Sequence, residues 1–126
     1  SRGMPGEIFR EQILACFITD PAGLKLRHDI GIDVIAWECD YPHTDTTWPH
    51  SPEVLMDEFR GADVPDPEIN KIAFENSCRF FDFDPFVKVS RAEATVGALR
   101  ARAGDVDTST VSKDEYKARA ESSVGA

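Results

Sequence analysis

A carboxylate and an imidazole lie three residues apart, just past an apolar run. Asp40 and His43 are the ends of an Asp-Tyr-Pro-His segment that follows the apolar residues 34–37. A carboxylate just past a buried strand can bind a metal ion and take a proton from metal-bound water. The same aspartate can instead cap the turn that contains Pro42. Position alone leaves both interpretations open.

Other side chains near this segment offer weaker alternatives. His50 shares the loop with Asp40 and His43, so one loop could in principle carry three ligands, but a long loop holds ligands loosely. His28 falls on a predicted helix and is typical of a surface residue. Cys39 could act as a nucleophile, but no histidine is placed by sequence to activate it. No phosphate loop, nucleophile elbow or dinucleotide fingerprint is present.

Two apolar runs predict the strands that position this loop. Residues 12–19 and 33–37 both read as buried strands, as in a parallel sheet. Between them, Asp20 and Pro21 favour a helix start, and Gly31 favours its end. Strand, helix and strand over this distance predict a right-handed parallel βαβ unit. Because ligands gather at the carboxyl ends of such strands, Asp40 is expected there.

Helix signals follow the loop. Ser51-Pro52 and Asp66-Pro67 are each followed by an acidic residue, which is typical of helix starts, with Ser51 as the capping residue. Six of the eight phenylalanines lie within residues 59–86, so this region is expected to pack against the sheet. Asn76 and Arg79 share one helical face. The expected roles are structural: Arg79 pairs with a carboxylate, and Asn76 bonds loop backbone.

The character of the chain changes after Phe86. Capping boxes at residues 90–93 and 112–115 predict two further helices, the second with almost no apolar face. Such a helix is weakly ordered on its own. The sequence therefore predicts an α/β segment over residues 1–86 and a helical, partly flexible extension over residues 87–126.

Composition limits the class of protein. The chain has 126 residues and 41% hydrophobic content, which suits one domain, and a net charge of −9, which disfavours nucleic acid as a partner. No apolar run reaches the ~20 residues of a membrane span. Three widely spaced cysteines in apolar surroundings suit reduced thiols, so a cytoplasmic location is expected.

Three segments together resemble the amidohydrolase-2 family of metal-dependent hydrolases and decarboxylases, which includes aminocarboxymuconate-semialdehyde decarboxylase. Residues 35–43, with the Asp-Thr-Thr-Trp-Pro of residues 45–49, resemble its eighth-strand segment. Residues 20–24 resemble the turn after the seventh strand, and residues 75–81 resemble its closing helix. The resemblance covers roughly residues 8–86. Ser77 and Glu38-Cys39 depart from the commoner residues of the family.

The resemblance implies a fold, a cofactor and site residues. Members are (β/α)₈ barrels that hold a divalent metal, often zinc, through several histidines and the aspartate after the eighth strand. Asp40 would be that aspartate, acting as metal ligand, proton shuttle or both. His43 would lie at the mouth, beside the substrate or the metal ligands. The substrate would be a small organic molecule that is hydrolysed or decarboxylated.

The family's His-x-His pair is absent from this chain. A complete barrel takes ~250 residues, so the chain would hold only the last two βα units: two parallel strands plus several helices. The exposed strand edges would then be covered by self-association, by helices folding back or by the missing barrel segment. Alone, the chain is expected to bind metal weakly and turn over nothing. The alternative is a small non-catalytic α/β interaction module.

Overall fold

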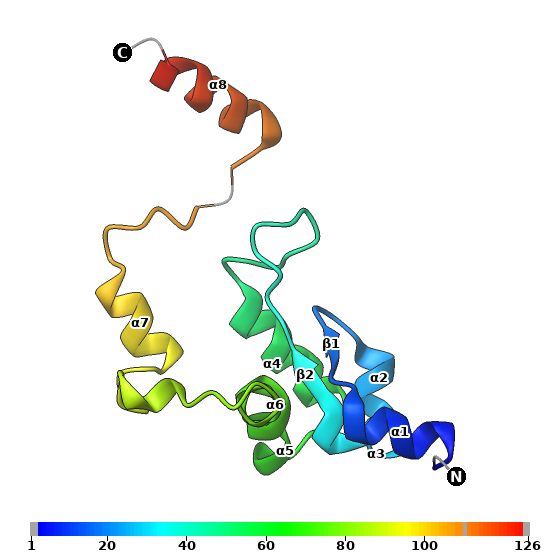
Figure 1. Cartoon of the computed structure of the whole chain (residues 1–126). Helices are drawn as coiled ribbons and strands as arrows, with labels where there is room; N and C mark the ends of the chain where they lie inside the picture. Colours follow the sequence, from blue (N-terminus) through cyan, green and yellow to red (C-terminus); the bar gives the residue numbers. More distant parts are fainter. Residues whose placement is uncertain (1–2, 110, 125–126) are drawn as a thin grey trace. The chain divides into compact units, whose positions relative to one another are not determined.

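The computed structural model describes residues 3–109 and 111–124. The chain divides into two compact units, with the boundary between Ala94 and Thr95. Figure 1 shows the elements of both units, coloured along the sequence. Both strands and the predicted site belong to the first unit.

The sheet consists of two short parallel strands in the described part of the chain. Strand β1 (Ala15–Phe17) pairs with β2 (Ile35–Trp37), with Ala15 opposite Ile35 and Phe17 opposite Trp37. The Glu38 amide extends the ladder by donating to the Phe17 carbonyl at 2.9 Å. The predicted parallel pair is therefore present, although both strands are shorter than the apolar runs that predicted them.

The predicted first strand was too long at its amino end. Helix α1 (Pro5–Gln12) occupies the residues before β1 and includes Gln12, which was expected to lie in the strand. A proline in the first turn favours this helix, and the Glu7 carboxylate accepts the Met4 amide at 2.7 Å. Ile13 and Leu14 then connect α1 to β1 and belong to neither element.

The helical connection from β1 to β2 begins and ends at the residues that the sequence predicted. Helix α2 (Pro21–Lys25) is capped by Asp20, whose carboxylate accepts the Gly23 amide at 2.8 Å. Helix α3 (Arg27–Ile30) ends at Gly31, where φ is 123°, a conformation that favours glycine. The short 3-10 turn η1 (Ile32–Val34) then leads into β2, so Asp33 and Val34 precede the strand rather than belonging to it.

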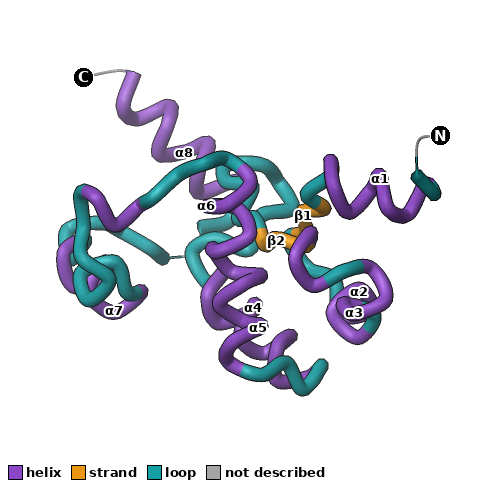
Figure 2. The backbone as a smooth tube through the Cα atoms, turned by 60° about the horizontal axis from the view of Figure 1, so that its bottom comes forward, coloured by secondary structure: helices purple, strands orange, loops and turns teal. Residues whose placement is uncertain are grey.

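Helices after the loop pack around β2. Their bounds are α4 (Ser51–Gly61), α5 (Asp66–Asn70), the π-helical turn η2 (Lys71–Glu75), α6 (Asn76–Phe80) and the 3-10 turn η3 (Pro85–Val87). Phe59 and Ile72 are fully buried and join Leu24 and Ile35 in one core. In both Figure 1 and Figure 2, β2 lies between β1 and α6.

The expected capping role of Ser51 is wrong. His50 occupies the capping position of α4, and Ser51 is the first helical residue, only 3% exposed. Its hydroxyl faces the loop instead, where Cys39 and Thr47 contact it. The tertiary contacts of the loop therefore decide which residue begins this helix.

Asn76 and Arg79 have the structural roles predicted for them. Asn76 is fully buried, and its Nδ2 donates to the carbonyls of Ile32 and Ile35, each at 2.8 Å. Arg79 donates to the Asp33 carbonyl, and its guanidinium lies 3.9 Å from the Asp33 carboxylate. One turn of α6 therefore fixes both ends of the segment that enters β2.

The expectation that the phenylalanine-rich region packs against the sheet is only partly correct. Phe59 is completely buried, but the side chains of Phe80, Phe81 and Phe83 are 49%, 69% and 62% exposed. A two-stranded sheet offers too little surface to cover them. An exposed apolar cluster of this kind marks a surface that favours contact with another apolar surface.

Asn76→Ala should destabilise the first unit strongly. The substitution removes the side-chain donor of the buried Ile35 carbonyl and of the partly buried Ile32 carbonyl, and each such loss costs about 1–3 kcal/mol. We expect the free energy of unfolding to fall by about 3 kcal/mol in a urea titration followed by circular dichroism. The matched change Asn70→Ala, on an exposed helical position, should alter it by less than about 0.5 kcal/mol. Equal effects of the two changes would contradict the role of Asn76.

The second unit contains helices α7 (Val96–Arg102) and α8 (Lys113–Val124). Thr95 caps α7 by accepting the Ala98 amide at 3.2 Å. The capping box of Ser112 and Glu115 is present before α8. The box of Ser90 and Glu93 also forms, but it closes only a turn in the first unit. None of the described helices is long and apolar enough to cross a membrane.

Candidate functional site

Asp40 lies three residues beyond the end of β2 and is held by His43. The Asp40 backbone is in the left-handed region, with φ of 51°, which aspartate tolerates better than most residues. Its carboxylate Oδ2 lies 2.8 Å from His43 Nδ1, and its carbonyl accepts the His43 amide at 2.9 Å. The two predicted site residues are therefore joined in one tight turn past a strand terminus.

The pair influences the protonation of the histidine. The hydrogen bond to Asp40, and then the charge of Asp40, raise the pKa of His43 above its ordinary value of 6.5. The His43 side chain is 71% exposed, so solvent screens the pair. The protonated pair is present below pH 6.5 and is lost as the pH rises through the raised pKa.

Asp40→Asn should lower the pKa of His43 toward 6.5. Asparagine keeps the left-handed backbone accessible but removes the negative charge. A proton NMR titration of the His43 ring would measure the change. Asp45→Asn is the matched control: Asp45 raises the same pKa only through a minor charge effect, so its removal should lower the pKa less. A larger shift for Asp45→Asn would contradict the pairing.

The three-ligand hypothesis for the loop is not supported. His50 uses its amide to bond the Thr47 carbonyl, and it precedes helix α4. Within residues 3–109 and 111–124, no three histidine, cysteine or acidic side chains are grouped so that they could hold a metal ion. Asp40 and His43 are therefore the only two of the loop's three candidate ligands that the structure joins directly. His28 is an exposed helix residue whose Nε2 lies 3.3 Å from the Glu68 carboxylate.

Acidic side chains surround a cavity at the carboxyl ends of both strands. The cavity has a volume of about 400 Å³ and is lined by residues 16–20, Glu38 and Asp45. Asp20 contributes its carboxylate here while capping α2, and the Glu58 carboxylate accepts the Asp20 amide at 3.1 Å. Residues 45–49 could form a pocket wall by their sequence, and Asp45 does line this cavity. Glu38 was not predicted as a cavity residue, and its position just after β2 is the only sequence signal for it.

Cys39 is held by hydroxyl groups rather than by a histidine. Its sulfur lies 3.5 Å from Ser51 Oγ and 3.6 Å from Thr46 Oγ1. The Thr47 hydroxyl donates to Ser51 Oγ at 3.0 Å, which leaves the Ser51 hydrogen free to point at the sulfur. The hydrogen bond from Ser51 has the largest effect and lowers the pKa of the Cys39 thiol, although burial opposes it.

Alkylation of Cys39 by iodoacetamide should begin at lower pH than alkylation of Cys16. Desolvation, and then the charge of Glu38, raise the pKa of Cys16. Mass spectrometry of the alkylated peptides would give a pH midpoint for each thiol. Ser51→Ala should raise the midpoint of Cys39 and leave that of Cys16 in place. Identical midpoints for the two thiols in the unmodified chain would refute this assignment.

The rest of the loop is fixed by local contacts. The Thr46 hydroxyl donates to the Cys39 carbonyl at 2.6 Å. The rings of Tyr41 and Trp48 lie 5.0 Å apart, and the peptide bonds that follow both residues are cis. Trp48 remains 43% exposed, so it packs on the loop itself rather than entering the core. These contacts close the loop back toward its own start.

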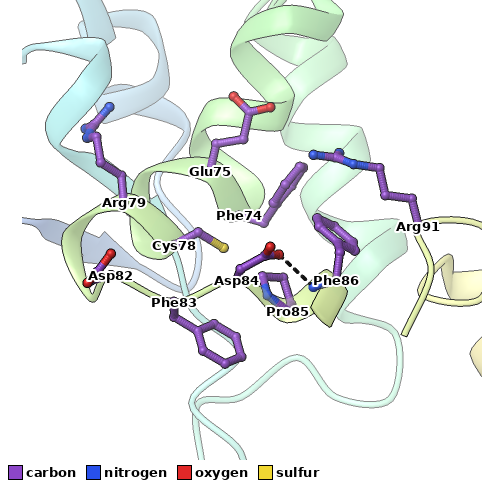
Figure 3. Close-up of a pocket in the computed structure, with 10 residues that line it drawn as sticks. All are labelled: Phe74, Glu75, Cys78, Arg79, Asp82, Phe83, Asp84, Pro85, Phe86 and Arg91. Carbon is purple, nitrogen blue, oxygen red and sulfur yellow. Dashed lines mark hydrogen bonds between the residues drawn. The ribbon is translucent and has the colours of Figure 1, made fainter. Parts of the chain in front are cut away.

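A second cavity was not foreseen from the sequence. It has a volume of about 660 Å³, and Figure 3 shows its lining side chains. The guanidinium of Arg91 lies over the rings of Phe86 and Phe74, with 4.2 Å and 5.4 Å to the ring centres. Asp84 uses its carboxylate to cap η3 through the Phe86 amide. These packing and capping contacts hold residues 84–91 together and attach them to Phe74 in η2.

No protein-family model and no curated protein sequence matches this chain. Its function is therefore inferred from the residues and the geometry described above.

Proposed function

We propose that this chain supplies the last two βα units of a metal-dependent amidohydrolase-type enzyme built on a (β/α)₈ barrel. The observation that carries the proposal is the position of Asp40. Its carboxylate stands past the carboxyl end of a strand with a parallel neighbour, and it is oriented by His43. This is the place where barrel enzymes carry catalytic residues.

The remaining parts of the resemblance support this proposal. The segment that resembles the turn after the seventh strand follows β1 and caps α2. The segment that resembles the closing helix contains Asn76 and Arg79, which hold the entry to β2. Short parallel strands, each followed by a helix, are also the arrangement that a barrel repeats.

The donor set in this chain fits only part of a metal site. Catalytic zinc sites take three protein ligands and keep one open position. Asp40 offers one carboxylate, and His43 is the side chain that orients it or contacts substrate. A divalent metal, such as zinc, would supply an activated water or a polarised carbonyl group. The other ligands must come from other strands, so no reaction step is assigned to this chain alone.

The proposed reaction is the hydrolysis or non-oxidative decarboxylation of a small organic substrate. In either reaction Asp40 would carry a proton or coordinate the metal ion at the mouth of the barrel. The rival function, a non-catalytic interaction module, gives Asp40 only the turn-forming role that its bond to His43 also permits.

The isolated 126-residue chain should bind zinc substoichiometrically and should not hydrolyse or decarboxylate a substrate panel. It carries too few ligands for a catalytic site. Metal analysis after gel filtration, together with the activity assays, would check this. Tight stoichiometric zinc with turnover by this chain alone would contradict the proposal that further strands complete the site.

The same experiment on the complete polypeptide encoded by its gene separates the two functions. The enzyme requires a His-x-His after a predicted strand there, and Asp40→Asn should reduce its turnover by about 10²–10⁴-fold without unfolding it. Asp63→Asn is a matched control on another left-handed aspartate and should leave turnover unchanged. A polypeptide without further metal-ligating strands would favour the interaction module.

A further inference from the structure

Arg91 and Glu75 bring charges of opposite sign to the second cavity, whose volume is about 660 Å³. Neither side chain forms a hydrogen bond or an ion pair with another residue in the described part of the chain, and the two do not pair with each other. In the view of Figure 3, both charged groups lie above the ring of Phe74. Charges that no protein group neutralises are available to a charged ligand at this cavity.

The other charged residues of the lining are less available beside Arg91. Arg79 is tied to the turn before β2, and Asp84 caps η3. Asp82 lies on the left of Figure 3 with Arg79, away from Arg91. The charges beside Phe74 are therefore one positive and one negative, and a ligand that neutralises both must carry both signs.

The guanidinium of Arg91 is held in a position that suits a carboxylate. It lies 4.2 Å from the ring centre of Phe86 and 5.4 Å from that of Phe74. The two rings pack edge to face, with their centres 5.9 Å apart. Stacking on aromatic rings leaves the N–H groups at the edge of the guanidinium free to donate, and this fork matches the two oxygens of a carboxylate.

The π-helical turn η2 places the residues opposite Arg91. Phe74 and Glu75 are the last two residues of this turn and line the cavity, whereas Ile72 and the next residue, Asn76, are fully buried. Turns of this kind are rare, and they occur frequently at functional sites. The irregular turn therefore marks this cavity, rather than the regular part of the helix, as a candidate binding site.

The remaining wall of the cavity is apolar and extends into a neighbouring cavity. Cys78, Phe83 and Pro85 line the second cavity and also line one of about 670 Å³, whose wall includes Trp37 and Phe81. The side chains of Phe81 and Phe83 are exposed. An apolar group of a ligand that covered them would remove apolar surface from water.

We propose that the second cavity binds a free α-amino acid with an apolar side chain. The carboxylate of the amino acid accepts hydrogen bonds from Arg91, and its ammonium group pairs with Glu75. Its side chain lies against Phe83 and Pro85. A simple anion would leave Glu75 without a partner, and a simple cation would leave Arg91 without one. No residue of the Asp40 loop lines this cavity, so the inference stands without the proposed function.

Titration with L-phenylalanine tests this inference on the intact 126-residue chain. In ¹H–¹⁵N NMR spectra, the amide signals of Glu75 and Phe86 should shift saturably, with a Kd on the order of 1 mM for so small a ligand. No metal takes part, so this result is independent of the proposed enzyme function. The absence of a saturable shift at these two residues would overturn the proposal.

Three related ligands separate the contributions of the two charges and of the side chain. L-Phenylalaninamide lacks the carboxylate and N-acetyl-L-phenylalanine lacks the ammonium group, so each should bind at least about tenfold more weakly than L-phenylalanine. Glycine keeps both charges but has no apolar side chain, and it should also bind more weakly. Equal affinity for the amide or the acetylated ligand would overturn the requirement for a zwitterion.

Two substitutions assign each charge to its residue. Glu75→Gln should weaken L-phenylalanine binding at least about tenfold and leave the affinity for N-acetyl-L-phenylalanine unchanged. Arg91→Lys keeps the charge over the rings but removes the planar fork, so it should weaken L-phenylalanine binding and leave the affinity for L-phenylalaninamide unchanged. The matched controls Glu11→Gln and Arg60→Lys lie at exposed positions of α1 and α4 and should bind as the unmodified chain does. Unchanged affinity in both cavity variants, with NMR spectra that show the fold intact, would overturn the assignment.

Discussion

The structure depends on one buried amide. Asn76 donates to the carbonyls of Ile32 and Ile35 and so ties the turn before β2 to the helix that packs beside it. A strand of three residues has too few ladder bonds to hold its own position. This link therefore helps to hold in place the start of the loop at Glu38, and with it the orientation of the Asp40 side chain. Arg79 adds a second tie from the next turn of α6 to Asp33.

From that fixed strand, the loop is positioned by short-range contacts. Cys39 is held between two hydroxyl groups, and Thr46 returns to the Cys39 carbonyl. Asp40 then turns the chain through a left-handed conformation and meets His43. The result is an acidic group whose orientation is set by contacts within its own loop. Preorganisation of this kind is what a metal-ligating or proton-carrying carboxylate needs.

The first unit leaves apolar side chains exposed at the end of α6 and after it, although its core is closed around Phe59 and Ile72. Phe80, Phe81 and Phe83 stay exposed because the two-stranded sheet is too small to cover them. The amide that anchors β2 keeps one buried oxygen without a partner among the described residues. Buried polar groups without a partner are rare in native structures.

The sequence by itself determined the features that local chemistry controls. Asp20 and Gly31 bound the crossover helices because a side-chain cap and a left-handed glycine act within a few residues. The parallel pair of strands and the bond from Asn76 to loop backbone were also predicted, since apolar runs and helical spacing carry that information. The Asp40–His43 pair needed only a turn of four residues to form.

Only the tertiary structure decided what depends on residues distant in sequence. The length of β1, the orientation of Ser51 and the exposure of Phe81 each follow from what other segments place nearby. Ser51 faces Cys39, twelve positions earlier, instead of capping its own helix. Phe81 stays exposed because two strands cannot cover it. Packing depends on contacts between segments that are distant in sequence. A local pattern of residue types does not specify which segments will make those contacts.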